Sequence, residues 1–204
     1  MKIIVATRNP GKLREIRLGL EGLAVELLSL ADFPAAPEVE EDGDSFAANA
    51  VKKARALCAD TGIPALADDS GLEVDALQGA PGIRSARFAG EGATDAENNA
   101  KLLSLLHGVR PEKRTARFRC VIALAWPDGR VDTVEGIVEG RILEVPRGDQ
   151  GFGYDPLFYS SELNASFAEV VTEVKLRASH RGKALARIRQ ILQFDVKRPE
   201  GSGT

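Results

Sequence analysis

The chain has 204 residues, 44% of them hydrophobic, which predicts one domain with a sizeable core and leaves little room for a second independent one. Its 27 Lys and Arg residues stand against 30 Asp and Glu, a net charge of −3, so it lacks the positive field of proteins that bind nucleic acid non-specifically. Without a signal-peptide apolar region or a run of the ~20 apolar residues of a membrane span, we expect a soluble cytoplasmic protein with no membrane partner.

The N-terminal residues predict a strand, a loop and a helix. Lys2–Ala6 is a β-branched run, and apolar residues recur at helical spacing from Leu13 to Leu20. The polar run between them, Thr7–Lys12, contains an Asn-Pro-Gly turn and a lysine, and it ends at a helix N-terminus, which favours anions. It therefore resembles a phosphate-binding loop in kind, although it lacks the Walker A pattern and an ordinary turn is the plainer interpretation.

An acidic run follows the second predicted strand. That strand is expected near Val25–Leu30, and the proline-spaced segment Phe33–Val39 suits neither a helix nor a sheet interior. The next five residues, Glu40–Asp44, contain four carboxylates directly before a helix. A solvated turn is the default interpretation, but carboxylate oxygens are also the ligands that a hard divalent cation prefers.

The helix after the acidic run is expected at Ser45–Ala59. Its apolar stripe includes Phe46 and Leu57, and Lys53 falls at the edge of that stripe. A lysine at this position either extends past the core to solvent or points into a cleft.

The next apolar run ends in two adjacent carboxylates. Ala65–Ala67 predicts a short buried strand, and Asp68–Gly71 is a run of turn formers that should end it, at the edge where open α/β sheets bind ligands. Because neighbouring residues of an extended chain point to opposite faces, only one of Asp68 and Asp69 can face a cleft, while the other braces the scaffold. The stretch predicts a cation site, with an ordinary aspartate-rich turn as the alternative.

The middle of the chain shows mainly structural patterns. They predict, in order, a strand at Leu72–Ala76, a loop or flap at Gly79–Gly90, a capped helix from Thr94 to about Leu106, a hairpin of Arg117–Trp126 with Val131–Val138, and a strand at Arg141–Val145.

Two further polar clusters lie near the C-terminus. Gly151–Pro156 combines an aromatic ring that could stack on a base with a carboxylate, although a glycine-rich turn with core aromatics would look the same. Ser179 is a good N-cap for the following helix, and it places His180 and Arg181 where a phosphate or a base edge would meet the positive helix end. A polar tail is expected from Asp195 to Thr204.

Together, five of these segments resemble the inosine triphosphate pyrophosphatase family, also called non-canonical purine NTP pyrophosphatases. The resemblance runs from Ile3 to about Leu192 and rests on Thr7–Lys12, Ala67–Gly71, Gly79–Ile83, Phe152–Pro156 and Ser179–Arg181. It implies an α/β fold, a two-lobed single domain over residues 1–194 with a mixed twisted β-sheet, flanking helices and a central cleft, followed by the tail at residues 195–204. It also implies a homodimer that uses Mg²⁺ to hydrolyse ITP, dITP and XTP to the monophosphate and pyrophosphate.

The resemblance further implies roles for single residues. Asp69 matches the catalytic base and a metal ligand, and Glu40 matches the other metal ligand, with Glu41 open as the alternative. Substrate contacts are implied for Thr7, Arg8, Asn9, Pro10, Gly11, Lys12, Lys53, Ser70, Phe152, Gly153, Tyr154, Asp155, Lys175, His180 and Arg181. Two positions depart from the family pattern: Arg84 replaces an expected aromatic residue, and Leu176 stands where relatives often carry a polar one.

Base choice follows from the donors at the C-terminal cluster. N–H groups of His180 or Arg181 would pair with O6 of a 6-keto purine, whereas the amino group of adenine would meet them donor against donor. The sequence therefore predicts a preference for inosine and xanthine over adenine.

Two other classes of function compete with the enzyme. A nucleotide-binding regulator would keep the cleft without turnover, and a nucleic-acid-binding module would use the basic residues Arg117, Arg119, Arg181 and Lys183. The acidic balance and the lack of aromatic residues among the basic ones count against the module. Release of pyrophosphate would separate an enzyme from a regulator.

Overall fold

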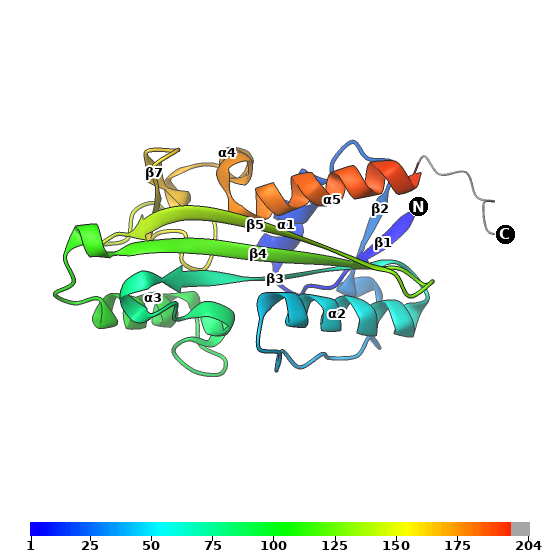
Figure 1. The fold of residues 1–204 in the computed structure, drawn as a ribbon, viewed down its shortest axis with the longest axis horizontal. Coiled ribbons are helices and arrows are strands. Elements are labelled where there is room, and N and C mark those ends of the chain that lie inside the picture. Colours follow the sequence, from blue (N-terminus) through cyan, green and yellow to red (C-terminus); the bar gives the residue numbers. More distant parts are fainter. Residues whose placement is uncertain (197–204) are drawn as a thin grey trace.

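One seven-stranded sheet, in the order β2-β1-β3-β4-β5-β6-β7, organises residues 1–196, the part of the chain that the computed structural model describes (Figure 1). The strands are β1 (Lys2–Val5), β2 (Glu26–Ser29), β3 (Ala65–Val74), β4 (Thr115–Ala125), β5 (Val131–Ile142), β6 (Phe158–Ser160) and β7 (Ala165–Ser166). β1 pairs in parallel with β2 and β3, and all the other neighbouring strands are antiparallel. The sheet is therefore mixed, as the sequence predicts.

Five α-helices flank the described sheet. They are α1 (Pro10–Gly19), α2 (Phe46–Thr61), α3 (Asp95–Leu105), α4 (Thr172–Ala178) and α5 (His180–Val196). Helices α1, α4 and α5 lie on one face of the sheet, and α2 and α3 lie on the other (Figure 1). None of the helices in residues 1–196 combines the length and the apolar character needed to span a bilayer.

The hydrophobic residues form separate clusters at the two ends of the long strands. At one end, α1 and α5 bury Ile16 and Ile188 against one face of the sheet, and α2 buries Ala54 against the other. At the other end, α3 and β6 enclose a second cluster that includes Leu102 and Phe158. These clusters are the cores of two lobes that share β3, β4 and β5, which confirms the predicted two-lobed α/β domain.

The run of turn formers does not end a strand, so that prediction is wrong. β3 continues through Asp68–Gly71 and pairs with β4 at every residue from Ala65 to Val74. Polar side chains are tolerated inside the sheet because they alternate between its faces and each carboxylate has a cationic partner there. The two aspartates therefore lie in the middle of a strand and not at its end.

Other boundaries also differ from the sequence-based expectation. Helix α1 begins at Pro10, inside the predicted loop, because Asn9 caps it and proline suits the first helical position. β5 is one strand where two were expected, and α4 was not predicted. Helix α5 extends through Val196, two residues into the predicted polar tail, and the rest of that tail lies outside the described residues.

Candidate active site

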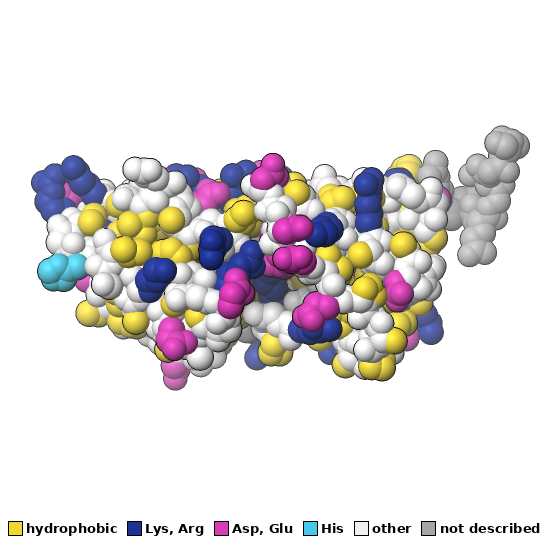
Figure 2. Space-filling view, turned by 90° about the horizontal axis from the view of Figure 1, so that it is seen from below, with side chains coloured by type: hydrophobic (Ala, Val, Ile, Leu, Met, Phe, Trp, Pro, Cys, Tyr) yellow, Lys and Arg dark blue, Asp and Glu magenta, His cyan; other side chains and the backbone are white. Residues whose placement is uncertain are grey.

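A cleft between the lobes brings most of the predicted site residues together. Two adjoining pockets share Asn9, Lys12, Ser70 and Ala86, so they form one continuous space across β3. Figure 2 shows acidic and basic side chains gathered around a hollow on the face that carries α2 and α3. One end of the cleft lies at the N-terminus of α1, and the other lies at a group of aromatic residues that includes Phe118 and Phe152.

The α1 end presents a capped helix N-terminus to the cleft. The side chain of Asn9 accepts a hydrogen bond from the Lys12 backbone N–H at 3.0 Å, and Thr7 Oγ1 accepts one from the Asn9 N–H at 3.2 Å. Arg8 extends to Glu38 on the opposite rim, with Arg8 Nη1 2.8 Å from Glu38 Oε1. Pro10 has no N–H and the Lys12 N–H is bonded to Asn9, so the Gly11 N–H and the Lys12 ammonium are the groups of this turn that can hold an anion.

Asp68 is the brace that the sequence analysis expected. Its carboxylate is fully buried, with Lys12 Nζ 2.5 Å from Oδ1 and Arg181 Nε 3.1 Å from Oδ2. Cys120 Sγ lies 3.0 Å from Oδ2. Burial alone would raise the pKa of Asp68, but the charges of Arg181 and Lys12 outweigh it and hold the pKa of this carboxyl well below its usual range. Asp68 is thus a fixed negative charge.

Asp69 points to the opposite face of β3, into the cleft. Asn49 Nδ2 donates to Asp69 Oδ2 at 3.2 Å, and Lys53 Nζ lies 3.5 Å from Oδ1. Burial raises the pKa of the Asp69 carboxyl, and the charges of Lys53 and Lys12 only partly oppose this. A cleft-lining carboxylate with a raised pKa is suited to accept a proton from water.

Lys53 lies inside the cleft, the second of the two positions that its helical register allowed. Its ammonium is 2.6 Å from Glu41 Oε1 and 2.8 Å from the Asp68 carbonyl oxygen. Burial alone would lower the pKa of Lys53, but the Asp69 and Glu41 carboxylates outweigh it and raise that pKa above its usual value. The lysine therefore bridges two carboxylates as a full positive charge.

Of the two candidate glutamates, Glu41 and not Glu40 lies beside Asp69. Glu41 lines the cleft, and Arg87 fixes it from the opposite lobe, with Nη2 2.9 Å from the Glu41 carbonyl oxygen and Nη1 3.5 Å from Oε2. Glu40 is exposed, and its side chain makes no hydrogen bond or ion pair within residues 1–196. The sequence left both open because a one-residue change of register in a loop has no local signature.

The carboxylates present fit a hard divalent cation. Among the described residues no group of three His, Cys, Asp or Glu side chains is arranged to hold a metal, but Asp69 and Glu41 share one positive charge, the Lys53 ammonium. Mg²⁺ is commonly bound by one or two carboxylates together with substrate phosphates. A pair of oxygen donors open to the phosphate end of the cleft suits such an ion.

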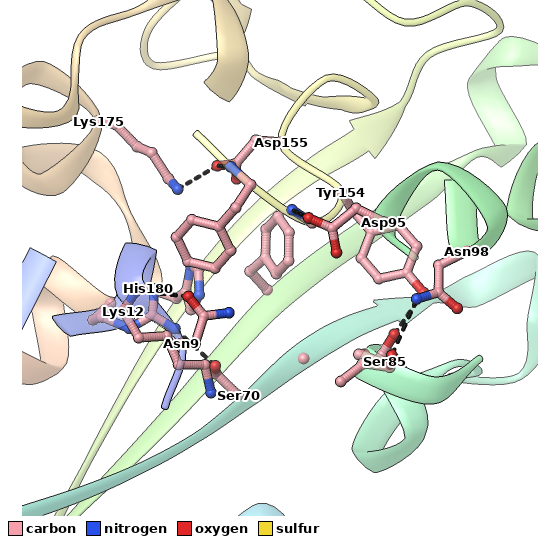
Figure 3. A pocket seen from close by; sticks show the side chains of 16 residues that line it. Asn9, Lys12, Ser70, Ser85, Asp95, Asn98, Tyr154, Asp155, Lys175 and His180 are labelled. Carbon is pink, nitrogen blue, oxygen red and sulfur yellow. Dashed lines mark hydrogen bonds and ion pairs between the residues drawn. The ribbon is translucent and has the colours of Figure 1, made fainter. Parts of the chain in front are cut away.

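The aromatic end is lined by Phe118, Phe152 and His180. Figure 3 shows His180 on the same side of the pocket as Asn9 and Lys12. The His180 ring stacks on Phe118 with centroids 4.6 Å apart, and its Nδ1 has no partner among the described residues. Burial, with the charges of Arg181 and Lys175, lowers the pKa of His180 well below its usual value, so the imidazole is neutral. A neutral imidazole facing a pocket offers one donor and one acceptor to a ligand.

Asp155 and Lys175 form a buried ion pair beside Phe152. Lys175 Nζ lies 2.5 Å from Asp155 Oδ2 and 2.8 Å from Glu15 Oε1, and Phe152 N–H donates to Asp155 Oδ2 at 2.9 Å. Burial raises the pKa of Asp155, and Lys175 opposes this. The pair holds the loop that carries Phe152.

Arg181 is buried in the cleft wall and holds residues of α1 and β3 together. It is 1% exposed, its Nη2 donates to Ser70 Oγ at 2.8 Å, and its other nitrogens contact Asp68 and Glu15. Glu15 was missed by the sequence analysis, although it lies three residues after Lys12 and so on a neighbouring position of the same helix face. Three of the donors of Arg181 are thus already used within the protein.

Two glycines allow the start of α5 to lie this deep. A Cβ on Gly136 of β5 would lie 2.0 Å from the His180 carbonyl oxygen, and one on Gly182 would lie 1.5 Å from the Leu176 carbonyl oxygen. The side chain of Ser179 accepts the Gly182 N–H at 3.1 Å, which confirms the predicted N-cap. The backbone can therefore approach the sheet closely enough to bury His180 and Arg181.

The structure places nearly all the expected residues in the cleft wall. Those that line it are Thr7, Arg8, Asn9, Lys12, Lys53, Asp69, Ser70, Phe152, Gly153, Tyr154, Asp155, Lys175, His180 and Arg181. Pro10 and Gly11 form the first turn of α1 behind it, where Gly11 packs on the Phe152 ring. Of the two positions that depart from the family pattern, Arg84 is exposed outside the cleft lining and Leu176 is buried in the core.

The chain is similar to known proteins over nearly its whole length. A family model described as the Ham1 family matches residues 3–191. The chain is 58% identical over 191 residues to a dITP/XTP pyrophosphatase of Geobacter sulfurreducens, covering 94% of this chain and 96% of the relative. It is 57% identical over 192 residues to one of Desulforamulus reducens, with the same coverage.

Solved structures match the fold as a whole. A HAM1 protein from Coxiella burnetii superposes with a TM-score of 0.86 at 41% identity, over 95% of this chain and 99% of the other. The Staphylococcus aureus Ham1 protein gives 0.85 at 36% identity, over 96% and 100% of the two chains.

Proposed function

The chain belongs to the Ham1 family, and we propose that it hydrolyses dITP, ITP and XTP to the nucleoside monophosphate and pyrophosphate. One observation carries the proposal. A single cleft joins a helix N-terminus with Lys12, the carboxylate pair of Asp69 and Glu41, and an aromatic pocket with a neutral histidine. These are the parts needed to bind a triphosphate, attack it and read its base.

Hydrolysis at the α-phosphorus assigns separate tasks to the residues of the phosphate half. Asp69 orients the attacking water and accepts its proton, acting more by position than by strong basicity, because a carboxylate held near Mg²⁺ keeps a low pKa. Lys12 and the positive N-terminal end of α1 stabilise the negative charge of the departing pyrophosphate. Asp69 and Glu41 would hold Mg²⁺, which when bound neutralises phosphate oxygens.

The aromatic half selects the base. A purine stacks on the ring of Phe152, and the neutral imidazole of His180 donates its N–H to O6 of hypoxanthine or xanthine. Adenine offers an amino donor at that position and leaves a buried polar group unpaired, which costs more than a missing contact. The pocket should therefore discriminate against ATP.

The Mg²⁺ requirement, the homodimer and the cytoplasmic location are also part of the proposal. They rest on the resemblance to the family and, for Mg²⁺, on the two oxygen donors beside the phosphate end of the cleft. Sedimentation of the purified chain, together with dialysis against EDTA, tests the first two directly.

The decisive experiment measures pyrophosphate release from ITP, XTP, ATP and UTP with and without Mg²⁺. We expect kcat/KM for ITP and XTP about 100-fold or more above that for ATP, and no turnover without the metal. ATP cleaved as well as ITP would overturn the base-pocket argument. ITP bound without pyrophosphate release would favour the nucleotide-binding regulator.

A further inference from the structure

Helix α3 holds the loop that carries Phe152, although no residue of α3 was expected in the site. Gly153 N–H donates to Asp95 Oδ2 at 2.6 Å (Figure 3). Asn99 Nδ2 donates to the Gly153 carbonyl oxygen at 2.9 Å. Asp95 and Asn99 are four residues apart and so lie on one face of the helix. Both backbone polar groups of Gly153 are thus bound from the second lobe.

The loop depends on such outside contacts for its shape. Gly153 has a φ of 61°, in the left-handed region, and the loop belongs to no helix or strand. Tyr154 is a further anchor of the loop, because its hydroxyl donates to the Ser85 carbonyl oxygen at 2.9 Å. The Asp155 carbonyl oxygen also accepts the Ala168 N–H at 3.3 Å. The Phe152 ring therefore takes its place partly from where α3 holds the next residue.

We propose that Asp95 and Asn99 are positioning residues for the base pocket. By binding both backbone polar groups of Gly153, they fix the position of the neighbouring Phe152 ring, on which a purine stacks. The inference rests on the proposed function, because it assumes that the aromatic half binds the base. Each of these hydrogen bonds contributes a modest free energy. The bond from Gly153 N–H to Asp95 is exposed but has a charged acceptor, which strengthens it. The bond from Asn99 to the Gly153 carbonyl oxygen is strengthened by partial burial.

The phosphate half of the cleft serves as an internal control for substitutions that affect the base half. Asn49, Lys53 and Glu41 surround Asp69 on the α2 side, and none of them contacts Gly153, Asp95 or Asn99. Inorganic tripolyphosphate can use the phosphate half alone because it carries no base. A substitution that displaces the loop carrying Phe152 should therefore weaken the binding of ITP and leave the binding of tripolyphosphate unchanged.

The test compares three substitutions in the full chain. Asn99→Asp is isosteric but turns the donor toward Gly153 into an acceptor, Asp95→Asn keeps an acceptor without the charge, and Ser104→Ala changes an exposed residue of the same helix. We measure kcat and KM for ITP and the inhibition constant of tripolyphosphate. N99D should raise KM for ITP about tenfold, while kcat stays within about threefold and the inhibition constant of tripolyphosphate within about twofold of the parent values. The KM of D95N should fall between those of N99D and the parent. The KM of S104A should equal that of the parent.

Two outcomes would overturn the inference: a KM for ITP in N99D within about twofold of the parent, or an inhibition constant for tripolyphosphate that rises in parallel with KM. A parent protein that does not hydrolyse ITP would instead overturn the proposed function. In that case, the dissociation constants of ITP and tripolyphosphate are compared between the parent and the three variants. They still decide whether Asp95 and Asn99 position the loop that carries Phe152.

Discussion

Lys12 Nζ lies 2.5 Å from Asp68 Oδ1, so the first turn of α1 is tied to the middle of β3. The lysine that the sequence assigned to phosphate binding is therefore already directed into the cleft by a buried carboxylate. Asp68 keeps a second cation, Arg181, on its other oxygen. An arriving phosphate can share Lys12 with Asp68 without leaving that carboxylate unpaired.

Lys12→Ala should lower kcat/KM for ITP about 100-fold, because it removes a charged donor that stabilises the departing pyrophosphate. Lys52→Ala is the matched control, since Lys52 is an exposed lysine of α2 that pairs with Asp42. Steady-state kinetics of the two variants compare them directly. Equal values for both would remove Lys12 from the phosphate site.

Asp69→Asn and Asp68→Asn should separate catalysis from stability. Asp69→Asn should lower kcat by about 10²–10⁴-fold and leave the free energy of unfolding equal or higher, because it removes a carboxylate whose burial is unfavourable. Asp68→Asn should instead destabilise the fold by about 3–5 kcal/mol, because Arg181 then loses a buried partner. Turnover assays and urea unfolding give the two readouts. Activity of D69N within about tenfold of the parent would contradict the role of Asp69.

Glu41→Gln should raise the Mg²⁺ concentration needed for half-maximal activity about tenfold, whereas Glu40→Gln should not change it. The expectation follows from the side chains, since Glu41 faces Asp69 across Lys53 and Glu40 is exposed. Calorimetric titration of Mg²⁺ into each variant gives a second readout that is independent of turnover. A larger effect of E40Q would show that the acidic loop rearranges when the metal binds.

His180 should contribute a pH dependence to the stability of the fold. Burial lowers the pKa of His180 in the folded protein, whereas in the unfolded chain it titrates near about 6.5. Below that pH the unfolded state binds more protons, so the free energy of unfolding falls as pH decreases, and the contribution is fully present above it. His180→Gln should reduce the slope between pH 5 and 7, measured by urea unfolding.

Arg181→Ala should act first on stability. The substitution removes Arg181 as a partner of Asp68 and leaves Glu15 paired with Lys175 alone. Breaking a buried ion pair costs about 3–5 kcal/mol. Arg177→Ala, at an exposed position of α4, is the control. A loss of the preference for ITP over ATP in R181A without a loss of stability would instead support the base contact that the sequence suggested.

The sequence by itself determined the features that depend on short-range patterns. The caps at Thr94 and Ser179 follow from side chains that bond to backbone N–H groups three residues away. The register of Lys53 at the edge of α2 follows from helical periodicity, and the opposite roles of Asp68 and Asp69 follow from strand alternation. These effects act within a turn or a strand, so a local pattern was enough to place them.

Tertiary structure decided what depends on partners far along the chain. β3 continues through its aspartates because β4 pairs with it at every residue and cations from other elements neutralise the carboxylates. Glu41 faces Asp69 because Arg87, 46 residues away, holds its backbone carbonyl. Arg181 became a brace because Glu15, Asp68 and Ser70 converge on it from two elements. No local window contains these contacts, and the free energy of a buried charge depends on which partners the fold brings to it.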